Sequence, residues 1–348
     1  MQHAITRAVS ALSVCAVLLG TSLLASPPTV GASSLTPRLA AQEARVAISV
    51  KHTCAIVDNG DVLCWGENTV GELGRGDTVS SLGAGAGEMA QLVAVPMPDG
   101  EGAVAIAAGL DFTCAILESG RVACWGDGRA ALGLARGTGA AGRVGSTNTP
   151  ATVGAVALPG NGRAVQIAAG WYHVCVVLTD GHVVCWGEGT NGRLGYGNTA
   201  DIGDDETPAD NAVNGGFVPL PGGLTALSVA AGGSSTCAIL SDQTVSCWGK
   251  GDVGQLGYGY LSDVGGTTID DLDTAGTVGM PDGLGAVALA MGFQHTCAVL
   301  GDGTVVCWGS GNFGVLGKGD PFPIGDQFDR LVADAPRVAL PGGVDAIV

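Results

Sequence analysis

The chain has 348 residues, with 15 Lys and Arg against 32 Asp and Glu, for a formal net charge of −17. Its apolar content of 46% argues against general disorder, and its 60 Gly lack the three-residue period of collagen. Glycine at this frequency in an apolar chain predicts many turns, and hence short strands rather than long helices. The acidic balance works against binding to phosphate backbones, which requires clustered Lys and Arg. We therefore expect no nucleic-acid partner.

The first 32 residues have the features of a secretory signal peptide. Arg7 precedes a mostly apolar run from Ala8 to Ala25, and Val30-Gly31-Ala32 then offers small residues for cleavage. An uncleaved membrane anchor is the alternative, because a run of this length is borderline for spanning a bilayer. We predict a signal over residues 1–32, a short linker over residues 33–45, and no membrane span after cleavage. The expected location is secreted, periplasmic or at the cell surface.

Residues 46–348 consist of one unit repeated five times. Each unit carries two cysteines ten positions apart, the second of which opens a Cys-Trp-Gly motif, and the pairs recur every 60 to 62 positions. The five pairs are Cys54 with Cys64, Cys114 with Cys124, Cys175 with Cys185, Cys237 with Cys247, and Cys297 with Cys307. Five copies at a nearly fixed period indicate a repeat architecture. The last residues resemble the lead-in to a sixth unit, so two hypotheses stay open: a ring closed by the chain ends, and a fragment of a longer array.

Each unit has the pattern of a β-hairpin. In the first unit two β-prone runs, residues 52–57 and 61–65, flank the turn Asp58-Asn59-Gly60. This arrangement fits a three-residue loop with Gly in the left-handed position. Gln243 replaces that Gly in the fourth unit, where we expect backbone strain.

The hairpin register places the two cysteines of each unit opposite each other. With Asn59 at the midpoint, Cys54 faces Cys64, and the same count works in every unit. Opposed residues at a non-hydrogen-bonded position have Cα atoms about 4.5 Å apart, near the short end of disulfide geometry. We predict five local disulfides, since an exported chain meets an oxidising compartment. Buried free thiols and a metal site are the alternatives, although this spacing does not match that of zinc ligands.

The unit resembles the repeat of the regulator of chromosome condensation family. That repeat runs Ala-x-Gly-x-x-His, a hairpin with Gly, Trp-Gly and Gly-Gln-Leu-Gly. The third unit reads Ala-Ala-Gly-Trp-Tyr-His over residues 168–173, and residues 254–257 read Gly-Gln-Leu-Gly. The resemblance covers nearly the whole predicted mature chain and implies an all-β fold, a β-propeller with one four-stranded blade per repeat and usually seven blades. The chain departs from the family by having five units and a cysteine pair in each.

The resemblance also suggests functions, of which the best known is nucleotide exchange on a small GTPase. We do not transfer it, because the matching residues are framework and an exported acidic chain is not expected to meet a nuclear GTPase. We predict a non-catalytic exported scaffold that binds a protein or cell-surface glycan through loops on one propeller face. Secreted bacterial proteins of similar build bind a partner protein in this way. The alternatives are a hydrolase or lyase with a site at the central tunnel, a fragment of a longer structural or adhesin-like array, and a GTPase regulator.

Two adjacent positions vary between units while the frame around them repeats. They lie between the Gly and the His of the motif, and variable side chains on a rigid frame are where binding can be tuned. The candidate binding residues are Lys51, Leu110, Asp111, Trp171, Tyr172, Phe293 and Gln294. The aromatic members are of the types that anchor interfaces. Packing inside the tunnel or against a neighbouring blade is the alternative for them.

The sequence shows no catalytic constellation. His52, His173 and His295 share one repeat position, which favours bracing of a turn over catalysis, and His182 follows a hairpin turn where we expect exposure. Two acidic clusters lie between units: Asp201, Asp204, Asp205 and Glu206 in one, and Asp270, Asp271 and Asp273 in the other. Calcium favours such loops, but neither cluster fits the twelve-residue calcium loop. We favour a solvated acidic surface, and predict no catalytic residue, metal or cofactor.

Overall fold

The computed structural model describes residues 44–78, 81–127, 132–137, 142–267, 271–341 and 346. The chain divides into a unit of residues 1–38 and a unit of residues 39–348. The predicted signal, and all of the predicted linker before Ala44, lie outside the described residues. Among the residues that are described, no helix has the length and apolarity needed to cross a membrane.

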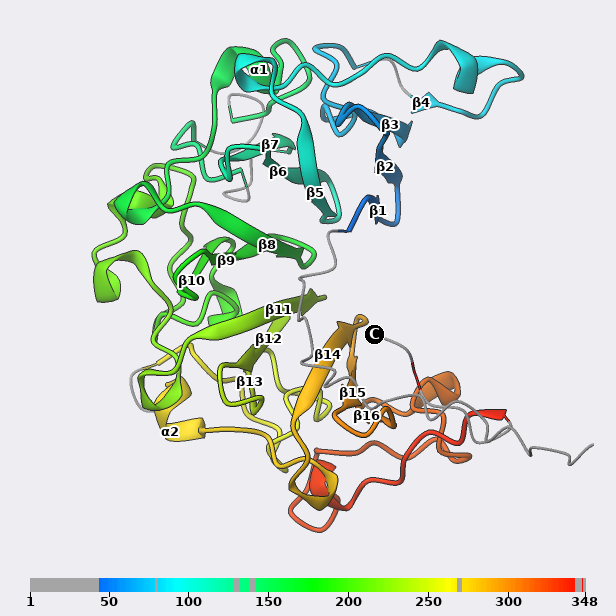
Figure 1. Cartoon of the computed structure of the whole chain (residues 1–348), viewed down its shortest axis with the longest axis vertical. Helices are drawn as coiled ribbons and strands as arrows, with labels where there is room; N and C mark the ends of the chain where they lie inside the picture. The colour runs from blue at the N-terminus through cyan, green and yellow to red at the C-terminus, as the bar shows by residue number, and fades with distance from the viewer. Residues whose placement is uncertain are drawn as a thin grey trace, which may run out of the picture. The chain divides into compact units, whose positions relative to one another are not determined.

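The second unit consists of five small antiparallel sheets, one in each repeat (Figure 1). Consecutive strands pair within each sheet, so every sheet is a meander. The first sheet holds β1 (Val46–Ile48), β2 (His52–Ile56), β3 (Val62–Glu67) and β4 (Ser81–Leu82). The others hold β5 (Ala103–Ala108), β6 (Phe112–Leu117) and β7 (Val122–Gly126); β8 (Ala164–Ala169), β9 (His173–Leu178) and β10 (Val183–Gly187); β11 (Ala226–Gly232), β12 (Ser235–Leu240) and β13 (Val245–Gly249); and β14 (Ala286–Met291), β15 (His295–Leu300) and β16 (Val305–Gly309).

A fourth strand is reduced to single bridges in the later repeats, such as the one between Gly126 and Val144. The predicted all-β fold of five repeats is therefore confirmed, with blades of three or four strands. Sheets that follow each other in the chain pack together through their first strands, β1 on β5, β5 on β8, β8 on β11 and β11 on β14.

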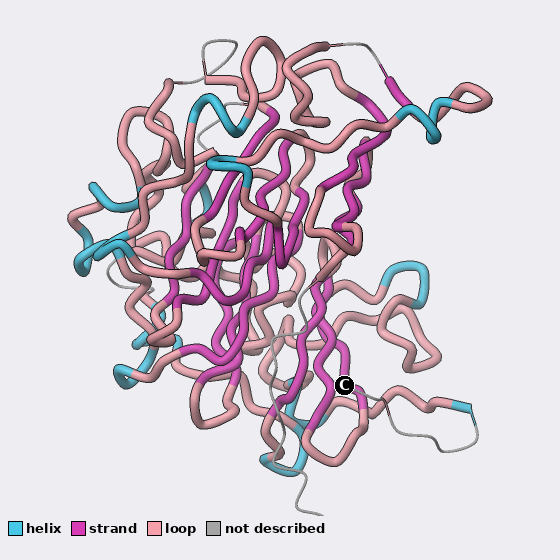
Figure 2. The backbone as a smooth tube through the Cα atoms, turned by 45° about the horizontal axis from the view of Figure 1, so that its top comes forward, coloured by secondary structure: helices cyan, strands magenta, loops and turns pink. Residues whose placement is uncertain are grey.

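In the described residues, helices occur as short turns in the loops outside the sheets (Figure 2). The α-helical turns among them are α1 (Pro150–Val153) and α2 (Leu272–Ala275). The 3-10 turns are Glu88–Gln91, Pro98–Gly100, Pro159–Asn161, Thr190–Gly192, Pro208–Asp210, Val213–Gly216, Pro221–Gly223, Pro281–Gly283, Asn312–Gly314 and Val332–Asp334. Four of the repeated prolines open such a turn just before an innermost strand, because the fixed φ of proline suits the first helical position. They are Pro98, Pro159, Pro221 and Pro281.

The hairpin register is the predicted one. Cys54 pairs with Cys64 and Ile56 with Val62 across β2 and β3, and the other four hairpins repeat this pairing. Gln243 has a φ of 69°, so it occupies the left-handed position that Gly fills in the other hairpins, as expected.

The ten repeat cysteines form the five pairs that the register predicts. Their sulfur atoms lie 2.05 to 2.12 Å apart, at disulfide-bonding distance, and their Cα atoms lie 4.0 to 4.1 Å apart. The bonded pairs are Cys54 with Cys64, Cys114 with Cys124, Cys175 with Cys185, Cys237 with Cys247, and Cys297 with Cys307. The Cα separation is shorter than the expected value of about 4.5 Å, so each bond joins two directly opposed residues of adjacent strands. This pairing favours disulfides over the alternatives of free thiols and a thiolate metal site.

Neighbouring sheets are locked together by the tryptophan of the Trp-Gly motif. The indoles of Trp125, Trp186, Trp248 and Trp308 are fully buried against the Leu-Gly motif of the preceding repeat. A Cβ atom on Gly257, for example, would lie 2.8 Å from the Trp308 Nε1, so only Gly leaves room for the ring. The Nε1–H groups of Trp125 and Trp308 also donate to backbone carbonyls of the preceding repeat, at 2.9 and 3.0 Å. Burying an aromatic side chain of 150–250 Å² contributes about 4–6 kcal/mol of transfer free energy.

Candidate binding site at the axial mouth

The ends of the five innermost strands surround one cavity of about 380 Å³. Each repeat contributes three consecutive residues, from the end of its innermost strand and the turn that follows. They are Ile48-Ser49-Val50, Ala108-Gly109-Leu110, Ala169-Gly170-Trp171, Ala231-Gly232-Gly233 and Met291-Gly292-Phe293. We call this cavity the axial mouth. None of the described lining residues is ionisable, so apart from the Ser49 hydroxyl these residues present apolar side chains and backbone.

In the second, third and fifth repeats the middle position of the lining triplet is Gly because a ring lies over it, whereas in the fourth a Cβ atom on Gly232 would meet the Gly292 carbonyl oxygen at 2.1 Å. A Cβ atom on Gly170 would come within 2.1 Å of the His173 ring, and one on Gly109 within 2.0 Å of the Phe112 ring. The first repeat has Ser49 instead, and its Oγ lies 2.9 Å from His52 Nδ1. The motif histidine or phenylalanine therefore fixes the turn, and the side chain that follows the turn glycine is presented to the mouth.

The third position of each triplet supplies the variable side chains. The rings of Trp171 and Phe293 stack there with centroids 4.3 Å apart and an interplanar angle of 13°, although they belong to the third and fifth repeats. The turns beneath are tied by backbone hydrogen bonds, from Trp171 N–H to the Gly233 carbonyl and from Leu110 N–H to the Trp171 carbonyl. Phe293 is 52% and Val50 78% exposed. Rigid backbone thus holds exposed apolar side chains, an arrangement suited to binding.

The structure divides the seven predicted binding residues into three groups. Leu110, Trp171 and Phe293 line the mouth. Lys51 and Asp111 instead form an ion pair of 2.6 Å that joins the first sheet to the second. The hydrogen bond with the buried Asp111 carboxylate raises the pKa of Lys51 above its usual value. This pair is placed to hold two sheets together rather than to meet a ligand.

The third group, Tyr172 and Gln294, lies one residue beyond the lining triplets. The Tyr172 ring meets that of Trp171 edge-on, with centroids 6.5 Å apart, so it supports the aromatic pair from the side. Sequence reasoning missed Ile48 and Met291, which also line the mouth. Both occupy the last position of an innermost strand, and the repeat alignment alone could have drawn attention to that position.

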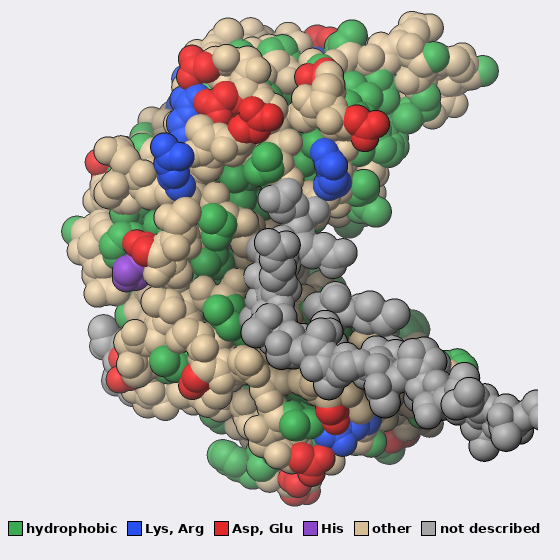
Figure 3. Space-filling view, in the orientation of Figure 1, with side chains coloured by type: hydrophobic (Ala, Val, Ile, Leu, Met, Phe, Trp, Pro, Cys, Tyr) green, Lys and Arg blue, Asp and Glu red, His purple; other side chains and the backbone are tan. Residues whose placement is uncertain are grey.

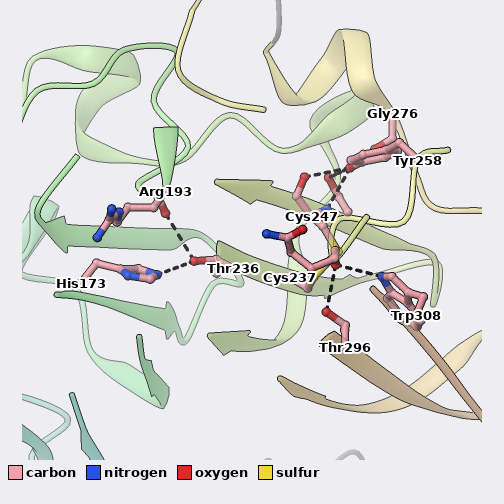
Figure 4. The surroundings of a disulfide bond; sticks show 11 residues. His173, Arg193, Thr236, Cys237, Cys247, Tyr258, Gly276, Thr296 and Trp308 are labelled. Atoms are coloured by element: carbon pink, nitrogen blue, oxygen red, sulfur yellow. Dashed lines mark hydrogen bonds between the residues drawn. A yellow bond between two sulfur atoms is a disulfide. The ribbon is translucent and has the colours of Figure 1, made fainter. Parts of the chain in front are cut away.

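The motif histidines brace neighbouring sheets as well as their own turns. The Nε2 atoms of His52 and His173 lie 2.7 and 2.8 Å from the hydroxyls of Thr113 and Thr236 in the next sheet. Thr236 donates its only hydroxyl hydrogen to the Arg193 carbonyl, so His173 Nε2 carries the proton of the shared hydrogen bond (Figure 4). Burial lowers the pKa of His52 to about 4 and that of His173 to about 3. Both rings are therefore neutral at pH 7, which suits a structural role.

Two tyrosines fasten the disulfide strands to the loops outside them. The Tyr258 hydroxyl accepts from the Cys247 N–H at 2.9 Å and lies 3.0 Å from the Cys247 carbonyl oxygen (Figure 4). Tyr196 makes the same contacts to Cys185 in the preceding repeat. Burial raises the pKa of Tyr258 to about 12. These hydroxyls satisfy backbone groups beside the disulfide, so this tyrosine position belongs to the frame.

Three of the acidic loop residues accept backbone hydrogen bonds, two within their own loops and one from another loop. Asp201 accepts from the Gly189 N–H at 2.8 Å, Asp271 caps α2 by accepting from the Thr274 N–H at 2.7 Å, and Asp273 accepts from the Gly222 N–H at 2.9 Å. Burial, with Asp205 and Asp204 nearby, raises the pKa of Glu206. Asp270 lies outside the described residues. Across the described ranges, no three His, Cys, Asp or Glu side chains are grouped so that they could hold a metal ion.

The charged side chains of the molecule are dispersed rather than gathered at one site. On the face shown in Figure 3, Lys and Arg appear in small groups beside acidic side chains, separated by uncharged surface. Many of them form ion pairs, such as Arg121 with Asp99 and Arg337 with Asp282. His182, exposed as predicted, lies 3.0 Å from Asp180 and against the Phe217 ring. Among described residues the axial mouth is thus the feature best suited to ligand binding.

Five segments of the chain match the regulator of chromosome condensation (RCC1) repeat: residues 44–72, 103–130, 164–193, 227–255 and 286–315. A longer form of the repeat matches residues 59–116 and 180–239. The chain belongs to the RCC1 repeat family. The matched segments cover the innermost strands, the mouth turns and the cysteine hairpins, so the family frame includes the site.

Relatives of this RCC1-repeat chain include two proteins of Arabidopsis thaliana. It is 29% identical over 290 residues to the ultraviolet-B receptor UVR8, covering 82% of this chain and 56% of the receptor. It is 28% identical over 228 residues to the mitochondrial RCC1 domain-containing protein RUG3, covering 62% and 44%. The chain therefore spans about half the length of these relatives. The crystal structure of human WBSCR16 superposes with a TM-score of 0.62 at 19% identity, over 85% of this chain and 67% of that one, and so shares its fold.

Proposed function

We propose that this chain is an exported, non-catalytic scaffold that binds an apolar segment of a partner protein at the axial mouth. The observation that carries the proposal is the lining itself. Fifteen residues from all five repeats converge there, none is ionisable, and the stacked Trp171 and Phe293 rings stand beside exposed aliphatic side chains. Aromatic anchors on a rigid apolar surface are typical of interface hot spots.

The same lining argues against an enzyme site at this position. General acid–base catalysis requires a titratable group within hydrogen-bond reach of the substrate, and the mouth residues provide none. Asp111, the acidic side chain nearest in sequence to the lining, is committed to its ion pair with Lys51. A binding role is therefore the one that the chemistry of the mouth supports.

A cell-surface glycan is the second candidate ligand, because sugars stack on flat aromatic surfaces and Trp171 with Phe293 offers one. Sugar hydroxyls also need polar side chains to orient them. Ser49 provides the only side-chain hydroxyl among the lining residues, and it lies 2.9 Å from His52 Nδ1. The other side chains that the described residues present to the mouth are apolar, which favours a protein segment.

Export is proposed on two grounds. The N-terminal sequence has the features of a signal peptide. In addition, all ten cysteines of the repeats lie in pairs at disulfide-bonding distance, and such bonds persist in oxidising compartments.

Peptide selection on the purified protein tests the binding site. Peptides from a random display library would be selected on the wild type, and their affinities then measured against Trp171→Ala and Phe293→Ala. We expect apolar peptides that lose at least tenfold in affinity on either change, about 1.4 kcal/mol. Phe328→Ala is the matched control, because Phe328 is 79% exposed and does not line the mouth.

Unchanged affinities for both mouth variants would exclude the mouth as the peptide site. A glycan array probed with the same proteins decides the second candidate. If glycans bind, and binding is lost with Trp171→Ala while peptides are not enriched, the ligand class is carbohydrate and the protein-segment proposal is wrong.

A further inference from the structure

Within the part of the chain that the structure describes, the first and last sheets leave opposite faces only partly buried. The central strands of the three middle sheets, β6, β9 and β12, are buried on both faces. Burial alternates instead along β2 and β15, and with opposite phase. On β2, Thr53 and Ala55 are half-exposed, whereas the residues at the same repeat positions on β15 are buried. On β15, the half-exposed residues include His295 and Cys297. The uncovered face of one end sheet corresponds to the covered face of the other.

The four junctions between neighbouring sheets draw on three kinds of contact, of which the first occurs at all four junctions, the second at two and the third at three. In the first contact, the indole of the later repeat packs on the glycine of the Leu-Gly motif in the earlier repeat. The second is the motif histidine of the earlier repeat with the threonine of the later one. The third is a backbone hydrogen bond from a loop glycine N–H of the earlier repeat to a glycine carbonyl of the later one. It joins Gly76 to Gly145, Gly197 to Gly265 and Gly259 to Gly325, at 2.9 to 3.0 Å.

The last sheet carries the earlier half of this junction, and none of the described residues supplies the later half. Gly317 occupies the position of Gly257, yet the three described atoms nearest its Cβ direction all belong to Val338, whereas Trp308 atoms lie there for Gly257. Gly319 occupies the position of Gly259, and in the part of the chain that the structure describes no atom lies within 4 Å of its Cβ direction. His295 has no side-chain hydrogen bond to a described residue, unlike His52 and His173.

The first sheet carries the later half. Trp65 is only partly buried, whereas the other four motif tryptophans are fully buried. Thr53 occupies the position of Thr113 and Thr236, and its hydroxyl makes no hydrogen bond with the described residues. Gly83 follows the bridge residue Leu82, as Gly325 follows Ile324, so its carbonyl stands where Gly325 accepts from Gly259. For each of the three contacts, the group that lacks a partner at one end of the array has a matching group at the other end.

We propose that the first-sheet face of one chain docks on the last-sheet face of a second copy, head to tail. A second copy forms this interface as a repetition of the internal ones and leaves the existing junctions unchanged. The main packing contacts of the described elements join neighbouring sheets only, so docking the two faces within one chain would require rearrangement at the junctions between them. The contact residues, Thr53, Trp65 and Gly83 on one side and His295, Gly317 and Gly319 on the other, are uncharged at pH 7. The net charge of −17 on each chain repels a second copy at long range, and salt screens this repulsion. Such a contact joins different faces of the two copies, so it extends into open chains.

Sedimentation of four proteins and one mixture tests the proposal. Thr53→Arg blocks the first-sheet face and His295→Arg blocks the last-sheet face, and both sites are partly exposed, so folding is expected to survive. We expect the wild-type mass to grow with concentration and each variant alone to stay monomeric. An equimolar mixture of the two variants should form dimers of one chain of each, because each retains the face that the other lacks. Phe328→Ala, away from both faces, serves as the control that assembles like the wild type.

Three outcomes would overturn the proposal. The first is a wild type that stays monomeric at every concentration; iodide quenching of Trp65 then shows whether the faces remain open or have paired within one chain. The second is a mixture of the two variants that stays monomeric while the wild type assembles. The third is a variant that assembles as readily as the wild type, which would place the contact elsewhere.

Discussion

The hydrogen bond between His173 and Thr236 leads to a prediction about stability in acid. Another repeat of the same chain shows which substitutions can replace this pair. In the second repeat the histidine position holds Phe112, and the threonine position of the following sheet holds Val174. The double variant His173→Phe with Thr236→Val therefore copies an exchange that the chain already accommodates. It removes a buried titratable ring and also removes His173 Nδ1, which has no hydrogen-bond partner among the described residues.

The magnitude follows from proton linkage. The pKa of His173 falls from 6.5 to about 3 on folding because its ring is buried. Since the folded-state pKa is depressed, stability is fully present above pH 6.5 and is lost as the pH falls and the unfolded chain takes up the proton. Between pH 7 and pH 4 this one group removes about 3 kcal/mol of unfolding free energy, at about 1.36 kcal/mol per pH unit.

Urea unfolding at pH 7 and pH 4, followed by tryptophan fluorescence with the disulfides intact, measures the effect. Carboxylates titrate alike in both proteins, so comparing the two pH-dependent losses isolates His173. We expect the wild type to lose about 3 kcal/mol more than the double variant. Equal losses would refute the reasoning, because they would mean that the His173 ring titrates normally in the folded state.

Two further predictions concern the frame. Gly257→Ala should destabilise the folded protein by several kcal/mol more than Gly283→Ala in thermal unfolding. Both glycines have positive φ, but only a Cβ atom at position 257 would clash with Trp308. Similar losses of stability in the two variants would mean that the Trp308 ring can move aside. Cys175→Ala should cost about 2–4 kcal/mol, and the remaining thiol of Cys185, fully buried, should react with iodoacetamide only in denaturant. Rapid labelling of the native variant would contradict the packing described.

The hairpins and their register could be predicted from the sequence because each unit repeats the same local signals. Cysteines ten positions apart around a turn glycine fix which residues oppose each other, and the structure has that register in all five units. Cys124 and Cys307, for example, lie opposite Cys114 and Cys297 as the count from the hairpin midpoint requires. The left-handed conformation of Gln243 followed from the same alignment. These features are local, so one unit contains all the information that they need.

The candidate site was only half predictable because it depends on contacts between repeats. Leu110 and Asp111 are adjacent variable residues, yet one lines the mouth and the other is buried in an ion pair with Lys51 of the preceding sheet. The stacking of Trp171 on Phe293 joins residues two repeats apart. The sequence shows which positions vary, but which of them face the axis is set by how the sheets pack.

The central claim is that the chain is a disulfide-reinforced scaffold that works outside the cytoplasm. The most direct test is the intact mass of the protein taken from the non-cytoplasmic fraction. The protein is alkylated in denaturant, with and without prior reduction, before the mass is measured. We predict a chain that begins at Ser33, takes no label before reduction and takes ten labels after it. A chain that stays in the cytoplasm with Met1 intact, and whose thiols label in denaturant without reduction, would contradict the account and reopen the GTPase-regulator and metal-site alternatives.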